Sequence, residues 1–265
     1  MSAVEDELRR LTESVGKPTL LPLASPADTY WELSRRPLMS LVFVLPIMLA
    51  YELGVLTLGP GSLRNAADVW LREFLRWVGF GHYFLLPLLV CGVLLGWHHV
   101  RHDPWKIQLR VVGVMWIEAI VWSLALLAIA RTMGGWVTFA VGLEERSLWS
   151  KFIGYLGAGF YEEILFRLLL LSGVALVAQR AGLNRRGSLL TAIGISSVLF
   201  AAVHYRVDLP FGISLGTEYG DQLKFGSCLF RIAAGVFFGC LFVYRGFGIV
   251  VGAHALYDLL LLVTG

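Results

Sequence analysis

Charged residues are scarce in this sequence. Only 15% of its 265 residues are Asp, Glu, Lys or Arg, whereas 57% are hydrophobic, and the mean hydropathy is +0.71. A soluble domain of this length carries far more charge, so the composition excludes an ordinary globular protein and predicts a polytopic membrane protein. The net charge of +3 is spread over the chain without a basic tract, which excludes a typical nucleic-acid-binding protein.

Cysteines are rare, and two common metal-site or redox signatures are missing. The three cysteines, Cys91, Cys228 and Cys240, lie in apolar runs outside any CxxC motif, and we interpret them as packing residues. No HExxH motif occurs. The first 36 residues are polar, which predicts a tail rather than a cleavable signal.

Long apolar stretches dominate the rest of the chain. Seven have the length of a membrane-spanning helix: 38–58, 82–98, 109–130, 152–179, 187–205, 225–244 and 246–264. Residues 64–78 mix charged and aromatic positions and predict an amphipathic helix on the membrane surface. The predicted fold is therefore all-α, a polytopic transmembrane bundle of about seven spanning helices plus an interfacial amphipathic helix. We divide it into a polar tail, 1–36, and a single transmembrane domain, 37–265.

Glycine spacing and loop charge add two further expectations. Glycines four residues apart let helices approach closely, and three such pairs occur: Gly92 and Gly96, Gly235 and Gly239, and Gly248 and Gly252. Lys and Arg are more numerous in the segments that share a side with the N-terminus, which predicts a cytoplasmic N-terminus. We expect an integral, multi-pass protein of a bacterial inner membrane.

The apolar run from Phe152 to Ala178 contains two adjacent carboxylates and a guanidinium, in Glu162-Glu163-Ile-Leu-Phe-Arg167. A charge at the centre of a bilayer costs at least about 2.5–3.5 kcal/mol, so three charges together indicate a function. On a helix Glu163 and Arg167 are one turn apart and can pair. Glu162 points about 100° away from Glu163, which leaves its carboxylate free to meet other groups.

Two histidines and an aspartate lie on later apolar segments. His204 follows Phe200 by one helical turn, which places an aromatic ring beside the imidazole. His254 and Asp258 are likewise one turn apart and share a helix face. Two histidines, an aspartate and the spare Glu162 on three helices of a small bundle predict one converging polar site.

The remaining polar residues in apolar segments are interpreted more simply. Glu52 or Glu118 is expected to pair with Arg231 and hold helices together, with a proton pathway as the alternative. A separate group beside Arg101 is expected to face lipid headgroups: His98, His99 and His102.

The three motifs resemble those of the CPBP intramembrane proteases, which include the CAAX prenyl endopeptidases and the bacteriocin-processing "Abi" proteins. The family patterns EExxxR, FxxxH and HxxxN/D are similar to Glu162 to Arg167, Phe200 to His204 and His254 to Asp258. The resemblance covers roughly residues 148–264. It implies a catalytic core in that region and an enzyme that hydrolyses peptide bonds within the membrane.

The chemistry of peptide hydrolysis suggests a role for each group. The reaction needs an activated water, a stabilised oxyanion and a proton for the leaving amine. Burial in an apolar wall makes a carboxylate a stronger base, so we assign Glu162 as the general base and Glu163 as its support. His204 would share the water proton or pass one to the amine, and His254 would face the oxyanion.

Asp258 leaves two mechanisms open. In the CAAX-type enzymes that this chain resembles, the position of Asp258 looks like an Asn. An Asn can donate a hydrogen bond to an oxyanion, whereas an ionised Asp cannot. Asp258 is therefore protonated, orients His254 or binds a metal. A zinc version would use four ligands: Glu162, His204, His254 and Asp258. Because the Glu163–Arg167 pair balances charge without a metal, we favour a metal-free glutamate mechanism with no cofactor.

A transporter that uses the same ionisable residues as a proton or ion relay is the alternative from another class. Transporters often show internal repeats and helices broken by Gly or Pro at the binding site. This sequence has no visible repeat, and Pro46 and Pro87 lie in other segments. We therefore favour the protease.

The expected partners are membrane lipid and a protein or peptide substrate. The CAAX-type relatives remove a C-terminal tripeptide from a prenylated protein at a site open to the cytosol. The predicted topology instead places His204 near the outer end of its helix. It favours an exported substrate, such as a C-terminal sorting tail, a bacteriocin leader or a peptide pheromone precursor.

Overall fold

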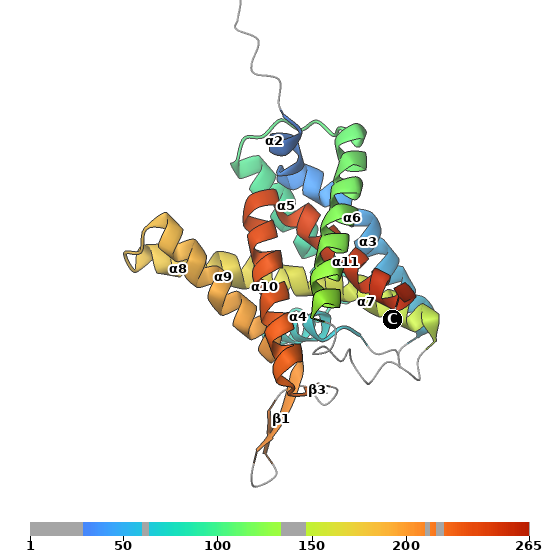
Figure 1. The fold of residues 1–265 in the computed structure, drawn as a ribbon. Helices are drawn as coiled ribbons and strands as arrows, with labels where there is room; N and C mark the ends of the chain where they lie inside the picture. The colour runs from blue at the N-terminus through green and yellow to red at the C-terminus, as the bar shows by residue number, and fades with distance from the viewer. Residues whose placement is uncertain (1–28, 60–63, 134–146, 210–212, 216–219, 265) are drawn as a thin grey trace, which may run out of the picture.

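The computed structural model describes residues 29–59, 64–133, 147–209, 213–215 and 220–264, so most of the polar tail lies outside the described residues. The described chain is mainly helical (Figure 1), as predicted. The helices before the first motif are α2 (Tyr30–Ser34), α3 (Pro37–Leu58), α4 (Ala66–Trp77), α5 (Leu85–Val100) and α6 (Leu109–Thr132). Those from the motif onward are α7 (Leu148–Gly157), η2 (Ala158–Glu162), η3 (Ile164–Leu171), α8 (Ser172–Arg180), α9 (Arg185–Ala202), α10 (Phe225–Arg245) and α11 (Phe247–Thr264).

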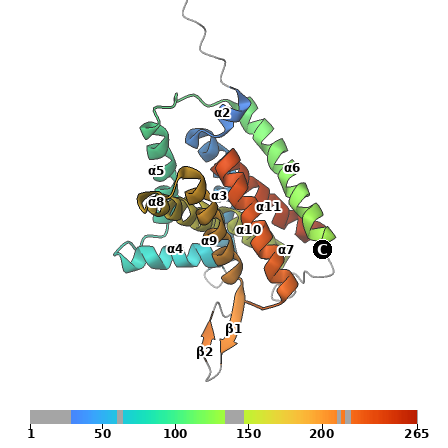
Figure 2. The same ribbon diagram turned by 60° about the vertical axis from the view of Figure 1, so that its left-hand side comes forward.

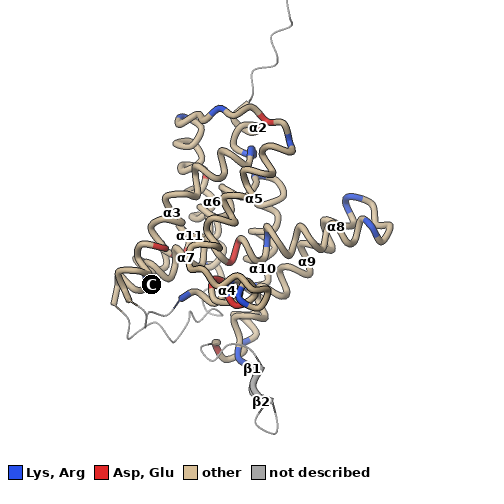
Figure 3. Tube along the Cα trace, turned by 180° about the vertical axis from the view of Figure 1, so that it is seen from behind, with Lys and Arg blue, Asp and Glu red and all other residues tan. Residues whose placement is uncertain are grey.

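Each of the seven predicted apolar segments is helical over most of its length. Four described helices, α3, α6, α10 and α11, are long and apolar enough to cross a membrane, whereas α5 is a shorter apolar helix. Charged residues are sparse along the helices and gather near their ends and around α4 (Figure 3). The structure thus supports an integral membrane protein, and the count of seven crossings stays a prediction.

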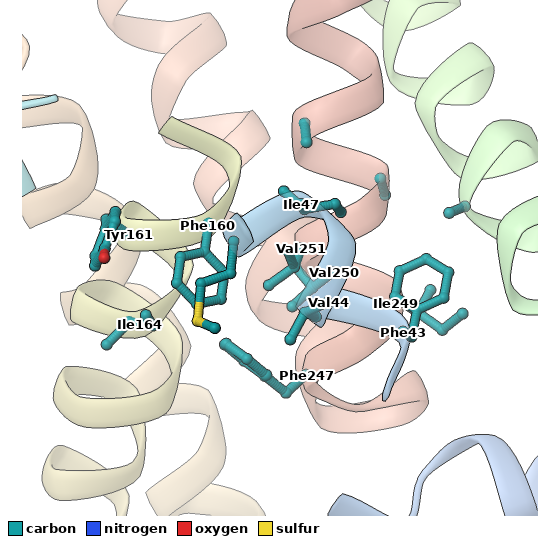
Figure 4. Close-up of a cluster of buried hydrophobic side chains, with 14 of the residues drawn as sticks. Phe43, Val44, Ile47, Phe160, Tyr161, Ile164, Phe247, Ile249, Val250 and Val251 are labelled. Atoms are coloured by element: carbon teal, nitrogen blue, oxygen red, sulfur yellow. The ribbon is translucent and has the colours of Figure 1, made fainter. Parts of the chain in front are cut away.

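The core is built where α11 packs between α3 and the helix that carries the first motif. α11 is buried continuously from Phe247 to Ala255, which is why its sequence is apolar on all sides. Figure 4 shows side chains of all three elements in contact around Val250 and Phe160. A Cβ at Gly159 would lie 2.5 Å from the Ala255 backbone, so only glycine permits this approach. The contact brings the first motif against the helix of His254.

The glycine prediction holds for two pairs of three. A Cβ at Gly235 would lie 2.8 Å from Ser197 Cα on α9, and one at Gly248 would lie 3.1 Å from Ser40 Cα on α3. The prediction for Gly92 and Gly96 is wrong, because a Cβ at either would meet no described atom within 4 Å. Both glycines lie on the outward face of α5.

A short sheet follows α9, between two of the predicted apolar segments. β1 (Tyr205–Leu209) lies between β2 (Ile213–Leu215), which is antiparallel to it, and β3 (Asp221–Gln222), which is parallel to it. The Asp221 N–H also donates to the His204 carbonyl at 2.9 Å. The sheet therefore begins directly at the histidine of the second motif and anchors its backbone.

The predicted amphipathic helix is α4, which runs at a steep angle to α5 (Figure 2). Its Asn65 cap accepts a hydrogen bond from the Ala67 N–H at 2.9 Å. One face of the helix buries Asp68 and Leu71, whereas Trp77 on the other is 84% exposed. The helix has one inward and one outward face, as an interfacial helix requires.

The predicted ion pair between Arg231 and Glu52 or Glu118 is wrong. Glu118 pairs with Arg245 at 2.5 Å, Glu52 pairs with Arg72 at 2.8 Å, and Arg231 pairs with Asp221 at 2.5 Å. The physical reason is depth, since Arg231 and Arg245 lie about 21 Å apart along α10 at 1.5 Å per residue.

The headgroup-facing histidine cluster is only partly correct. His99 and His102 are exposed, but His98 is fully buried and packs edge-on against Trp105 at 4.7 Å between ring centroids. Because successive residues of a helix point in different directions, His98 on α5 faces inward while His99 and His102 face outward.

Candidate active site

The first motif lies on a continuous helix that departs from α-geometry. Between α7 and α8 the backbone forms the π-helical segments η2 and η3, which flank Glu163. π-Helical turns are rare and are found mostly at functional sites. No sequence pattern predicted them.

Glu163 is fully buried, and one of its carboxylate oxygens contacts two side chains. Its Oε1 lies 3.1 Å from Arg167 Nη1, which is the predicted ion pair. The same oxygen lies 2.6 Å from His254 Nδ1, a contact that the sequence did not indicate. Glu163 thus links the first and third motifs.

Arg167 is also fully buried, and aromatic rings surround its guanidinium. The group lies 4.4 Å from the Phe200 ring centroid and 5.3 Å from that of Phe238. Such cation–π contacts and the carboxylate of Glu163 compensate for the loss of water around a buried charge. Phe200 therefore supports Arg167 on one side while its ring packs edge-on against His204, as predicted, at 4.9 Å.

His254 is held firmly in one orientation. Its ring stacks on Phe238 at 4.5 Å with an interplanar angle of 20°, and Nδ1 donates to the carboxylate of Glu163. Nε2 then faces two other carboxylates, 4.0 Å from Glu162 Oε2 and 3.6 Å from Asp258 Oδ2. This geometry fixes which ring nitrogen is available for chemistry.

His204 presents its Nε2 in the same way. Its Nδ1 lies 2.6 Å from the Phe200 carbonyl oxygen, and because a carbonyl can only accept, Nδ1 is the donor. Nε2 lies 3.8 Å from Glu162 Oε2. Both imidazoles therefore direct Nε2 toward the same carboxylate oxygen.

Glu162 has two oxygens in different surroundings. Oε1 accepts a hydrogen bond from Asn65 Nδ2 at 2.9 Å. Oε2, between the two imidazoles, is buried and has no hydrogen-bond partner among the described residues. The spare carboxylate expected from the motif spacing thus lies next to both histidines.

The structure brings together all the predicted site residues: Glu162, Glu163, Arg167, Phe200, His204, His254 and Asp258. Sequence reasoning missed Asn65 and Phe238. Asn65 could have been recognised as a helix cap, since Asn precedes the amphipathic stretch, but not as a partner of Glu162.

The four candidate zinc ligands lie somewhat farther apart than a bound zinc ion requires. Tetrahedral zinc with bonds of about 2.0–2.1 Å needs ligand atoms about 3.3 Å apart, whereas the facing atoms are 3.6 to 4.0 Å apart. Within the described ranges, no group of three or more His, Cys, Asp or Glu side chains is arranged to hold a metal ion. Bound zinc would supply a Lewis acid, and it would require Glu162, His254 and Asp258 to move closer together.

Comparison with known proteins gives one result. Residues 144–260, which include all three motifs, match the family model described as type II CAAX prenyl endopeptidase Rce1-like. No curated protein and no solved structure matches the chain. The match over residues 144–260 supports a place in the CPBP family of CAAX-type proteases, enzymes that hydrolyse peptide bonds.

Proposed function

We propose that the protein is an intramembrane endopeptidase in which Glu162 activates the attacking water. The observation that carries this proposal is the position of Glu162 Oε2, buried, without a described hydrogen-bond partner, and within 4.0 Å of Nε2 of both His204 and His254. A water between Glu162 and His204 would reach both, because 3.8 Å is less than two hydrogen-bond lengths.

The proposed reaction assigns each proton to a group. The water oxygen attacks the scissile carbonyl carbon while its proton moves to Glu162. His254, protonated and backed by Glu163, donates from Nε2 to the oxyanion. As the C–N bond breaks, the proton on Glu162 passes through His204 to the leaving amine.

The position of Asp258 supports one of its three possible roles. The orientation of His254 through Nδ1 already belongs to Glu163, whereas Asp258 lies 3.6 Å from Nε2. We assign Asp258 as a protonated carboxyl that donates to the oxyanion, in place of the Asn in similar enzymes.

The substrate and topology follow from the predicted orientation. We propose seven crossings, a cytoplasmic N-terminus in a bacterial inner membrane, and a site that opens toward the outer face. The substrate would be a membrane-associated protein cut near its C-terminus or at its leader, with a sorting tail ranked ahead of a bacteriocin leader, a pheromone precursor or a prenylated protein.

Cleavage of a reporter peptide by the purified protein in nanodiscs tests the mechanism. Glu162→Gln and His204→Ala should each lower kcat by about 10²- to 10⁴-fold, the usual contribution of general acid–base catalysis. Treatment with a chelator should leave the wild-type rate unchanged. Loss of activity with the chelator and its return with added zinc would establish the zinc version, and equal turnover by all three proteins would overturn the proposal.

A further inference from the structure

Asn65 lies outside the family-matched region and yet contacts the proposed catalytic base. Its Nδ2 donates to Glu162 Oε1 at 2.9 Å, while its Oδ1 accepts from the Ala67 N–H at 2.9 Å. Because Nδ2 can only donate and Oδ1 can only accept, these two bonds together determine the orientation of the amide. The cap of α4 therefore determines which atom Glu162 meets.

We propose that Asn65 is a positioning residue for Glu162, and that α4 is part of the active site although it lies outside the matched region. This inference rests on the proposed role of Glu162 as the base. By engaging Oε1, Asn65 leaves Oε2 directed at His204 and His254. An arginine in this place would neutralise the charge of the carboxylate. The neutral amide of Asn65 orients the carboxylate without doing so, and thus preserves its function as a base.

A buried polar network holds α4 in the position that this role requires. Asp68 accepts hydrogen bonds from Tyr51 at 2.9 Å, Arg64 at 3.0 Å and Arg72 at 2.5 Å, and Arg72 also reaches Glu52 at 2.8 Å. Burial lowers the pKa of Arg72, but the charges of Asp68 and Glu52 outweigh this effect and raise it above its ordinary value. The network ties the first turns of α4 to α3.

The Glu52 carboxylate also ties this network to the motif helix. It accepts from the Tyr161 hydroxyl, and Tyr161 directly precedes Glu162. The same polar network therefore holds both partners of the Asn65–Glu162 hydrogen bond. Such preorganisation is what a positioning role needs, because the carboxylate must be oriented before the substrate binds.

Two substitutions separate positioning from capping. Asn65→Ser and Asn65→Asp both retain an oxygen that can cap α4, but neither supplies the amide donor, and Asp adds a second negative charge beside Glu162. Because a hydrogen bond to a charged group is at stake, kcat should fall about 10-fold for Ser and about 100-fold for Asp. KM should stay within about twofold for both, since Asn65 acts on the base and not on the substrate.

Asn184 provides the matched control. It caps α9 in the same way, with its Oδ1 accepting from the Gly187 N–H at 2.8 Å, and makes no described contact with the site. Asn184→Ser and Asn184→Asp should keep wild-type kcat. The melting temperature of all four variants, measured in the same nanodiscs, reports any loss of folding.

The outcomes distinguish this inference from the function on which it rests. Wild-type kcat in both Asn65 variants would overturn the inference while leaving the mechanism intact, provided that Glu162→Gln is inactive. A rise in KM together with a lower melting temperature would also overturn it, because a merely structural cap would behave in that way. Wild-type turnover by Glu162→Gln would instead overturn the proposed function itself.

Discussion

Two Glu–Arg pairs in this protein, one fully buried and one partly buried, differ in how many partners their carboxylates have. Glu118–Arg245 joins α6 to α10, and Glu163–Arg167 lies within the motif helix. Both arginines lie over aromatic rings, Arg245 at 3.7 Å from Trp31 and Arg167 at 4.4 Å from Phe200. Neither the charge nor the aromatic packing therefore distinguishes the two pairs.

The pairs differ in how completely their carboxylates are hydrogen-bonded. Glu118 accepts from four donors: Arg245 Nε and Nη2, Trp122 Nε1 and the Tyr30 hydroxyl. Glu163 concentrates both partners on Oε1, and its Oε2, like that of Glu162, has no hydrogen-bond partner in the described part of the chain. The carboxylate of Glu118 is saturated and stabilises a helix contact, whereas Glu163 orients His254 with one oxygen and keeps the other without a described partner.

Removal of each arginine tests this difference most strongly. Arg167→Met should lower the free energy of unfolding by about 3–5 kcal/mol, because Glu163 is left buried and uncompensated. Activity per folded molecule should disappear as well, since Glu163 also orients His254. The measurement is thermal unfolding in nanodiscs combined with reporter cleavage.

Arg245→Met is the matched control for that experiment. It should destabilise the protein by less, because Glu118 is partly exposed and keeps Tyr30 and Trp122 as donors. The folded fraction should cleave at the wild-type rate, because Glu118 makes no described contact with the site. Loss of turnover in folded Arg245→Met, or full turnover in Arg167→Met, would contradict the distinction between a structural and a catalytic pair.

Neutralising the two carboxylates compares them at constant shape. Glu163→Gln should lower kcat by about 100-fold, because the neutral amide no longer stabilises a protonated His254. Glu118→Gln should leave kcat within about twofold and lower only the melting temperature. Equal kcat values for the two variants would show that Glu163 is structural too.

The sequence predicted the contact between residues of one helix. It also predicted some of the side chains from other helices that meet at the site. The spacing of Glu163 and Arg167 identified their pair, because i,i+4 neighbours meet on any helix. Intramembrane charge identified His204 and His254 as candidates, since unpaired polar groups are costly in an apolar segment. These inferences depend only on helix geometry and on the cost of burial.

The remaining contacts depend on how helices are placed relative to one another. The bond between His254 and Glu163 spans 91 residues and that between Asn65 and Glu162 spans 97, so neither has a local signature. Arg231 was paired wrongly because hydrophobicity gives the length of a helix but not the depth of each charge beside its neighbours. The π-helical segments likewise have no pattern in the sequence that predicts them.

The smallest expected effect concerns two glycines that look alike in the sequence. Gly159→Ala would place a Cβ 2.5 Å from Ala255, next to His254, so α11 must shift away from the motif helix. We expect a loss of about 1–3 kcal/mol in the free energy of unfolding, with a lower kcat because Glu162 and His254 separate.

Gly96→Ala on α5 is the contrasting substitution. Its Cβ would meet no described atom within 4 Å, and alanine favours a helix over glycine by about 0.8–1.0 kcal/mol in model helices. The melting temperature of Gly96→Ala should therefore stay the same or rise, with unchanged cleavage. If Gly159→Ala matched it in both measurements, the motif helix and α11 would not need their close approach, and the distance between Glu162 and His254 would not limit the reaction.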